Sequence, residues 1–179
     1  PMDIAGKYGA DAFRYYVTRE MQLGYDSEFT QERFDVRYNS ELANDLGNLA
    51  SRLANMLSRY SGGAVPTATV EEEAEKNLKA AWQQTSADAL KAFEELSLNR
   101  ALELINEFVK KMNAYLELRQ PWKLAKSTDA TDAARVQTCL ALVAEGLRLA
   151  VTLLTPVIPA TSEKVRASWG LAPVKLWEG

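Results

Sequence analysis

The chain has 179 residues, 47% of them hydrophobic and 25% charged, with a formal net charge of −3. This composition excludes an intrinsically disordered chain and allows one substantial core, so one main domain with a small appendage is expected. Histidine is absent and Cys139 is the only cysteine. These counts exclude an intramolecular disulfide and a multi-cysteine metal site, and they remove the commonest general base.

Composition also limits where the protein works and what it binds. No apolar run reaches the roughly eighteen residues of a membrane span, and no apolar signal core opens the chain, so we expect neither a membrane partner nor a bound metal. The apolar pattern around Cys139 predicts an inert core thiol, which fits a reducing, cytoplasmic location. The acidic balance argues against a sequence-indifferent nucleic-acid binder, but it leaves open the recognition of a few unstacked bases in an RNA loop.

Residues 1–34 are predicted to form a small leading unit of two short helices, which break at Gly9 and are followed by a loop. A long helix is predicted from Gln31 to about Ser61, with a bend near Asn39. The Gly62–Gly63 pair then ends this helix.

The remaining pattern is helical to the end of the chain. Thr69 and Glu72 have the spacing of a capping box, which predicts the start of the next helix. Long apolar-periodic segments follow, with no alternating strand pattern, and they predict helices over residues 69–96, 97–120, 131–154 and 159–170. The expected fold is therefore all-α, an antiparallel helix bundle over residues 35–179 preceded by the leading unit.

The helix after residue 40 has two faces of different chemistry. At about 100° per residue, its apolar stripe contains Leu42, Leu46, Leu49, Leu53, Met56 and Tyr60. Asn44, Asn48 and Arg52 line the opposite face. Asn costs roughly half a kcal/mol relative to Ala within a helix, and its amide carries both donors and acceptors. This face therefore suits the reading of nucleobase edges, although an ordinary solvated face is an equal alternative on this pattern alone.

A third stripe on the same helix consists of small residues. It contains Ala43, Gly47, Ala50 and Ala54. Small side chains allow close approach of two backbones, so this stripe is predicted to be a seam against another helix.

Three segments resemble one family. Residues 41–52 closely resemble the first long helix of the anticodon-binding domain of methionyl-tRNA synthetases, and residues 113–122 resemble its Asn-to-Pro-Trp element. Residues 7–16 resemble the segment that follows the KMSKS loop in class I synthetases. The resemblance implies a class Ia anticodon-binding bundle over residues 35–179. It also implies that residues 1–34, with their stem-contact-like segment, connect this bundle to the catalytic domain of the same parent chain.

The resemblance also assigns roles at an anticodon site. Asn44, Asn48 and Arg52 match the reading helix, Pro121 and Trp122 match a corner that stacks on a base, and Asn113 matches a residue that holds the two together. The implied partner is the anticodon stem-loop of tRNA(Met), with its CAU anticodon. Judged from its position alone, Trp122 is more often a core residue at a helix corner.

Cations near this corner are candidates for contact with the tRNA backbone. They are Arg119, Lys123 and Lys126. Arg14, in the leading unit, has two open interpretations: contact with the inner side of the tRNA, or a local ion pair with Asp11 or Glu20.

The chain lacks the signature motifs of the family's catalytic domain. It has no histidine for a HIGH motif and no KMSKS sequence, so we expect no catalytic residue and no cofactor here, whereas the parent enzyme would use ATP and Mg²⁺ to ligate methionine to tRNA. The alternatives are the same domain from a valine, isoleucine, leucine or cysteine enzyme, or a helical protein-interaction module.

Overall fold

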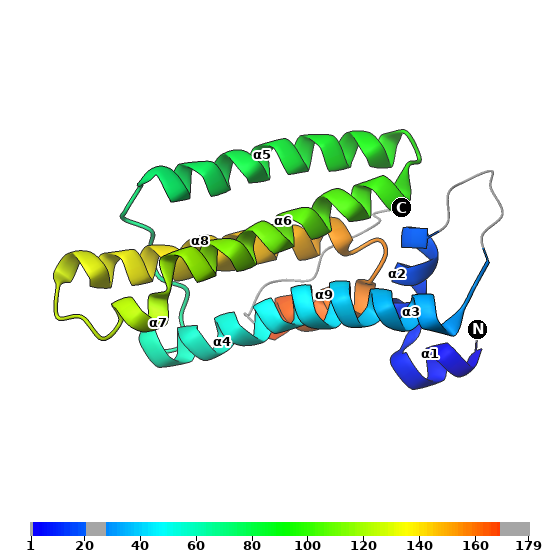
Figure 1. Cartoon of the computed structure of the whole chain (residues 1–179), viewed down its shortest axis with the longest axis horizontal. Coiled ribbons are helices and arrows are strands. Elements are labelled where there is room, and N and C mark those ends of the chain that lie inside the picture. The colour runs from blue at the N-terminus through cyan, green and yellow to red at the C-terminus, as the bar shows by residue number, and fades with distance from the viewer. Residues whose placement is uncertain (1, 21–27, 169–179) are drawn as a thin grey trace.

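The computed structural model describes residues 2–20 and 28–168, and every regular element in these ranges is a helix (Figure 1). The elements are α1 (Met2–Tyr8), α2 (Ala10–Glu20), α3 (Gln31–Arg37), η1 (Tyr38–Gly47), α4 (Asn48–Tyr60), α5 (Glu73–Glu94), α6 (Leu98–Arg119), α7 (Pro121–Leu124), α8 (Ala130–Leu154) and α9 (Pro159–Ser168). The predicted all-α helix bundle is confirmed.

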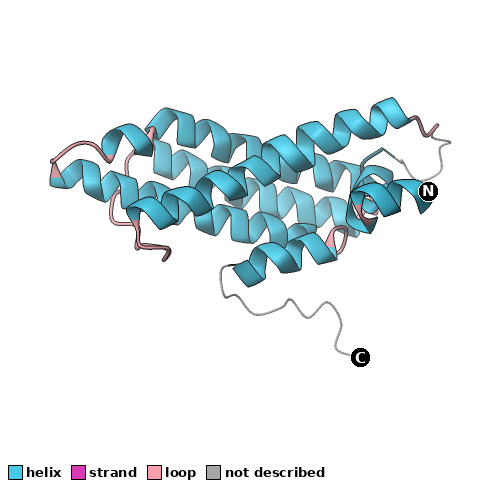
Figure 2. Ribbon diagram, turned by 90° about the horizontal axis from the view of Figure 1, so that it is seen from below, coloured by secondary structure: helices cyan, strands magenta, loops and turns pink. Residues whose placement is uncertain are grey.

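The long helices lie side by side along one axis, with α7 at one end and α1 and α2 at the other (Figures 1 and 2). Helix α6 packs against both α5 and α8, and α4 packs against α8. Their inward faces form the main core, where burial of each large apolar side chain is worth about 1.5–3 kcal/mol. Its fully buried members include Leu49, Leu53, Leu102, Phe108, Met112, Leu116, Leu140 and Leu147.

The segment from residue 31 to 60 runs as α3, η1 and α4 rather than as one α-helix. Where a bend was predicted, ten residues adopt the wider π-helical turn, and the Asn48 N–H reaches back five residues to the Ala43 carbonyl. Such wide turns are rare and often lie at functional sites. Asn113 on α6 donates from Nδ2 to the Asp45 carbonyl at 3.1 Å, so a neighbouring helix helps to hold this stretch.

The stripe of small residues is not a seam, and that prediction is wrong. Ala43, Gly47 and Ala54 are exposed. Most of the stripe lines a groove of about 430 Å³ whose other walls are α9 and the corner between α1 and α2.

Helix α5 begins later than the capping pattern predicted. Glu72, not Thr69, is its N-cap, and the Glu72 N–H donates to Glu75 Oε2 at 2.9 Å. The Thr69 and Val70 N–H groups instead donate to the buried Thr138 hydroxyl, each at 3.0 Å. A residue from α8 thus holds the segment before α5 in place, and the capping box forms three residues later, at Glu72 and Glu75.

Helix α8 is long and apolar enough to cross a membrane by length and composition. Of its most apolar eighteen-residue window, 61% is buried inside the bundle, so its apolar surface serves the core. Cys139 lies on this helix with no exposed surface, and burial raises the pKa of its thiol to about 12. The predicted inert core thiol is confirmed.

The leading unit is clamped to the bundle. Arg14 donates from Nε to the Val157 carbonyl at 2.9 Å and from one terminal nitrogen to the Pro156 carbonyl at 2.7 Å, so its guanidinium binds the corner after α8. Arg14 is exposed, and its contact with the tRNA stays a prediction. Asp11 Oδ2 accepts from the Thr161 N–H at 2.6 Å, and Tyr15 is part of the main core. The division at residue 34 falls inside α3.

Candidate nucleic-acid interface

The corner between α6 and α7 is built by two residues with special backbone conformations. Gln120 ends α6 in the left-handed region, with φ 45° and ψ 56°, and Pro121 starts α7 at the first helical position. Proline fits there because its fixed φ suits a helix and its missing N–H would have no helical partner. Pro121 is buried, whereas Trp122 is half-buried against the main core. The indole is therefore anchored by packing and still partly open.

Helix α4 supplies a cation to this indole. The Arg52 Cζ atom lies 5.3 Å from the centre of the Trp122 ring, within the range of a cation–π contact. One terminal nitrogen of Arg52 donates to Glu117 Oε1 at 2.6 Å, and this bond holds the guanidinium beside the ring. Arg52 and Trp122 thus lie together, as the resemblance implied.

The two asparagines of the polar face lie farther along the same side. Asn48 and Asn44 are both exposed, Asn48 at the start of α4 and Asn44 within η1. Asn113 is half-buried, and its Nδ2 donates to the carbonyls of Asp45 and Val109 at 3.1 and 3.3 Å. It therefore joins α6 to η1, while the exposed Asn44 and Asn48 amides form no hydrogen bond with another described side chain.

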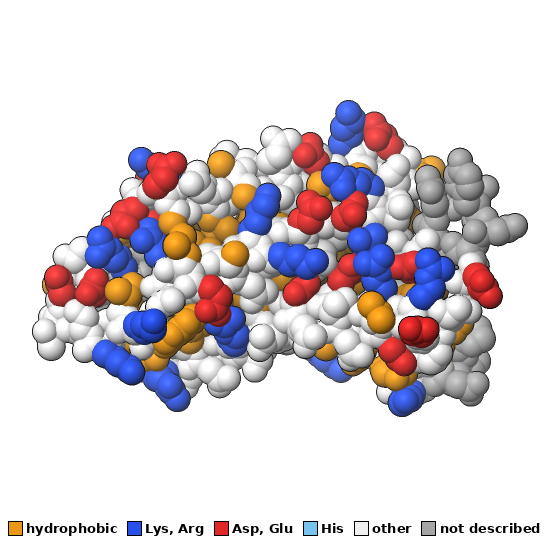
Figure 3. All heavy atoms as spheres, in the orientation of Figure 1, with side chains coloured by type: hydrophobic (Ala, Val, Ile, Leu, Met, Phe, Trp, Pro, Cys, Tyr) orange, Lys and Arg blue, Asp and Glu red, His pale blue; other side chains and the backbone are white. Residues whose placement is uncertain are grey.

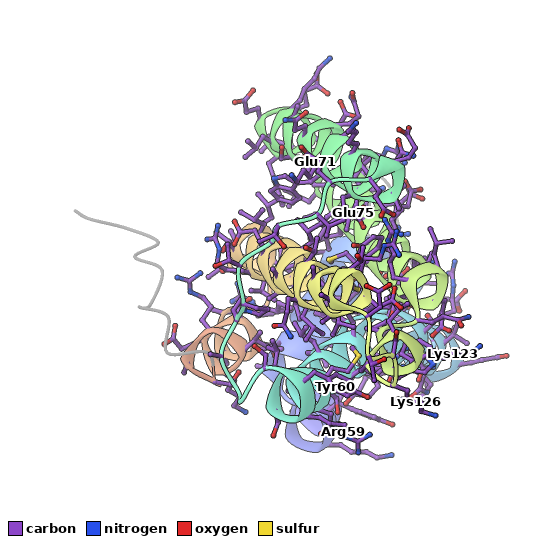
Figure 4. All side chains as sticks on the ribbon, turned by 90° about the vertical axis from the view of Figure 1, so that its left-hand side faces the viewer. Arg59, Tyr60, Glu71, Glu75, Lys123 and Lys126 are labelled. Atoms are coloured by element: carbon purple, nitrogen blue, oxygen red, sulfur yellow. The ribbon has the colours of Figure 1, made fainter. Side chains whose placement is uncertain are left out.

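Basic side chains surround the corner. Lys123, Lys126 and Arg59 are exposed and form no ion pair within residues 2–20 and 28–168. Figure 4 shows these three side chains, together with Tyr60, at the same end of the bundle. In the space-filling view, basic side chains gather around an apolar patch at that end, over α4 and α7 (Figure 3).

A depression of about 680 Å³ lies between the end of α4 and the indole. It is lined by Arg52, Asn55, Met56, Ser58, Arg59, Tyr60 and Trp122. Its wall combines an aromatic face, an amide and two guanidinium groups, the groups that proteins use to bind unstacked nucleotides.

Arg119 lies away from this surface. Its guanidinium faces α5, where it donates to Glu75 Oε1 at 2.7 Å and to Glu72 Oε2 at 2.9 Å. Its side chain is 15% exposed, so little of it could meet a phosphate. The structure brings Lys123, Lys126, Trp122 and Arg52 to one surface and puts Arg119 into an ion-pair cluster instead.

Three residues of the depression extend the set chosen from the sequence. Helical spacing places Asn55 and Arg59 on the same exposed face as Arg52, but neither was chosen as a site residue. Tyr60 was assigned to the apolar stripe, but it is half-buried and reaches the depression. Glu117 comes from a different helix, and no spacing in the sequence relates it to Arg52.

The two ends of the chain match two family models. Residues 1–54 match the model described as tRNA synthetases class I (M), and residues 75–170, more than half of the chain, match the anticodon-binding domain of tRNA ligase. The chain belongs to the family of anticodon-binding domains of tRNA ligases.

This anticodon-binding domain is similar to the matching region of methionyl-tRNA synthetases. Over 97% of its length it is 41% identical to the methionine–tRNA ligase of Streptomyces coelicolor and 37% identical to that of Deinococcus radiodurans. It superimposes on the apo methionyl-tRNA synthetase of Mycobacterium tuberculosis with a TM-score of 0.92 and 34% identity, over 97% of this chain and 35% of that one. The domain spans 32% and 27% of the two curated relatives.

Proposed function

We propose that this domain binds the anticodon loop of tRNA(Met) and reads its CAU anticodon, above all the first base. The observation that carries this proposal is the half-buried Trp122 ring with Arg52 beside it and the exposed amides of Asn48 and Asn44 along the same helix face. Cytosine offers an exocyclic amino donor together with O2 and N3 acceptors, so amide and guanidinium groups are suitable partners for its edge.

The loop phosphates would meet the cations around the corner. Arg59, Lys123 and Lys126 have no competing carboxylate among the described residues. Each phosphate contact of this kind adds salt-dependent affinity without sequence preference. In this proposal, stacking and edge contacts therefore give selectivity, and these cations give attraction.

Within the parent protein, the domain would select the tRNA and the catalytic domain would attach methionine with ATP and Mg²⁺. The leading unit would connect the two domains, and the cytoplasm is the expected location. The parent reaction requires the HIGH and KMSKS elements, neither of which occurs in this sequence.

The first test replaces the stacking ring. Trp122→Ala should weaken binding of a methionine-anticodon stem-loop by about 1–3 kcal/mol, the usual loss of one aromatic stack, while the bundle stays folded. Trp82→Ala is the matched control, because Trp82 packs on Phe108 at a ring distance of 5.2 Å within the bundle. The control should lower stability and leave the affinity of the folded protein unchanged. Loss of helicity in Trp122→Ala with no separate binding effect would make Trp122 a core residue only.

The second test addresses selectivity. Asn48→Ala and Arg52→Ala should each reduce discrimination between stem-loops with cytosine and uracil at the first anticodon position by about tenfold, which corresponds to about 1.4 kcal/mol. Ser51→Ala, on an exposed position between them, is the control. If all three variants discriminate as the unmodified domain does, the polar face is an ordinary solvated surface.

A third test concerns catalysis. The chain alone should show only background ATP–pyrophosphate exchange in the presence of methionine, because adenylate formation needs a site that binds ATP and stabilises the charge on the reacting phosphate. Exchange that follows the purified chain through chromatography would contradict this expectation.

A further inference from the structure

Arg119 connects the base-stacking corner to a buried carboxylate. Glu75 is 1% exposed, yet it accepts hydrogen bonds from the Tyr115 hydroxyl at 2.6 Å and from Arg119 Nε at 2.7 Å. A second Arg119 nitrogen pairs with Glu75 Oε2, and a third donates to Glu72 at 2.9 Å. Three helix ends meet here, because Arg135 on α8 donates to the same Glu72 at 2.7 Å.

The cluster around Glu75 and the Arg52–Glu117 pair bind opposite sides of α6. Two residues along a helix turn the side chain by about 200°, so Glu117 faces α4 while Arg119 faces α5. The last turn of α6 is therefore held from both sides by charge-assisted hydrogen bonds, which are the stronger kind. Its orientation is fixed immediately before the chain leaves the helix.

Trp122 follows only three residues after Arg119. The intervening Gln120 has the left-handed conformation, which a non-glycine residue keeps only when its surroundings hold it. The Gln120 carbonyl accepts from the Lys123 and Leu124 N–H groups at 2.8 and 3.2 Å, so this residue also starts α7. A shift of the Arg119 end would thus be transmitted through one constrained residue to the indole.

We propose that Arg119 is a positioning residue for Trp122: its pairing with Glu75 and Glu72 fixes the start of α7 and so sets the ring against Arg52 for base stacking. This inference rests on the proposed anticodon recognition and adds a residue that never touches the RNA. Arg135 offers an internal comparison, because it belongs to the same cluster but lies on α8, away from the corner in the chain.

The experiment follows Trp122 directly. In a background with Trp82, Trp169 and Trp177 replaced by Phe, Trp122 is the only tryptophan, so emission and acrylamide quenching report its setting without RNA. Arg119→Met should raise the quenching constant about twofold and reduce cytosine-over-uracil discrimination about tenfold. Arg119→Lys, which keeps one ion pair, should recover part of both effects, and Arg135→Met should change neither.

Arg119→Met leaves a buried carboxylate unpaired and could unfold the chain. The double variant Arg119→Met with Glu75→Leu removes that charge and should show the same two effects. If Arg119→Met and the double variant fold with unchanged Trp122 emission and quenching, the positioning role is overturned, whatever the RNA data show. If the unmodified chain does not discriminate cytosine from uracil, the proposed anticodon recognition fails instead, and a shifted Trp122 signal still supports the positioning.

Discussion

Two buried carboxylates, Glu41 and Glu75, each accept hydrogen bonds from a tyrosine hydroxyl and from an arginine. Glu41 accepts from the Tyr15 hydroxyl and from Arg37, both at 2.7 Å, at the end where the leading unit docks. Glu75 has the equivalent partners, a tyrosine and an arginine, at the α7 end. A buried charge is tolerated only when it is paired and hydrogen-bonded, so both sites are strongly specified by the fold.

The Glu75 cluster makes stability depend on pH. Burial alone would raise the pKa of this carboxyl, but hydrogen bonds from Arg119 and Tyr115 outweigh burial and lower the pKa. The unfolded chain therefore binds the proton at higher pH than the folded chain does, and the stabilisation is lost as the pH falls through the folded value. Glu75→Gln should cost about 3–5 kcal/mol near neutral pH.

The measurement is urea unfolding of both proteins from about pH 6 to about pH 3. The difference in unfolding free energy between the unmodified domain and Glu75→Gln should narrow as the pH falls. Glu94→Gln, an exposed change on the same helix, should make little difference at any pH. If the difference in unfolding free energy between the two proteins stays constant to about pH 3, the Glu75 charge contributes no net stability.

The three segments from residue 31 to 60 show what helical spacing predicts and where it fails. The apolar stripe correctly identified Leu49, Leu53 and Met56 as buried, because burial of one helix face follows from local periodicity. The π-helical turn could not be predicted, since its carbonyl at Asp45 is satisfied by Asn113, 68 residues away. Thr69 was wrongly predicted to cap α5 for the same reason, because its N–H is held outside the helix by Thr138, 69 residues away.

The candidate site was predictable to a similar extent. Arg52 and Trp122 were identified from motif resemblance and lie together, whereas Arg119 was grouped with Lys123 by nearness in the sequence. Gln120 breaks the helical phase between them, so the two cations face different sides of the domain. Sequence distance stops predicting spatial distance at such a residue.

The π-helical turn makes a specific prediction for Gly47. Alanine in place of glycine usually stabilises a helix by about 0.5–1 kcal/mol, but a Cβ at Gly47 would lie 3.0 Å from the Leu42 carbonyl oxygen. Gly47→Ala should therefore destabilise the domain by about 1–3 kcal/mol. Gly6→Ala in α1, where a Cβ meets nothing within 4 Å, is the control and should be neutral or stabilising. Thermal unfolding of both variants tests this contrast, and a stabilised Gly47→Ala would show that the turn relaxes.

Helix α2 of the leading unit packs closely against the bundle. Helix α2 packs on α6, Tyr15 lies in the main core, and Arg14 and Asp11 bind the corner between α8 and α9. A segment so attached should open only when the whole domain unfolds.

Hydrogen exchange tests this cohesion. Amides of α2 should exchange as slowly as those of α6, and Arg14→Met, which loses two hydrogen bonds, should lower stability by about 1–3 kcal/mol and speed exchange in α2 first. Arg33→Met is the control, because Arg33 is 58% exposed and its pair with Glu20 spans 3.6 Å, so its loss should cost little. Much faster exchange of α2 than of α6 in the unmodified chain would mark the leading unit as a separate folding unit.

Charge is distributed unevenly over the surface of this domain. The chain as a whole is acidic, with a net charge of −3, while Arg59, Lys123 and Lys126 are concentrated at the α7 end (Figure 4). Carboxylates also lie at this end, but Glu72 and Glu75 are paired with arginines. The three cations pair with no carboxylate among the described residues, so they attract an approaching polyanion within the screening length of the salt. The corner thereby offers RNA a small attractive region on a chain whose net charge is negative.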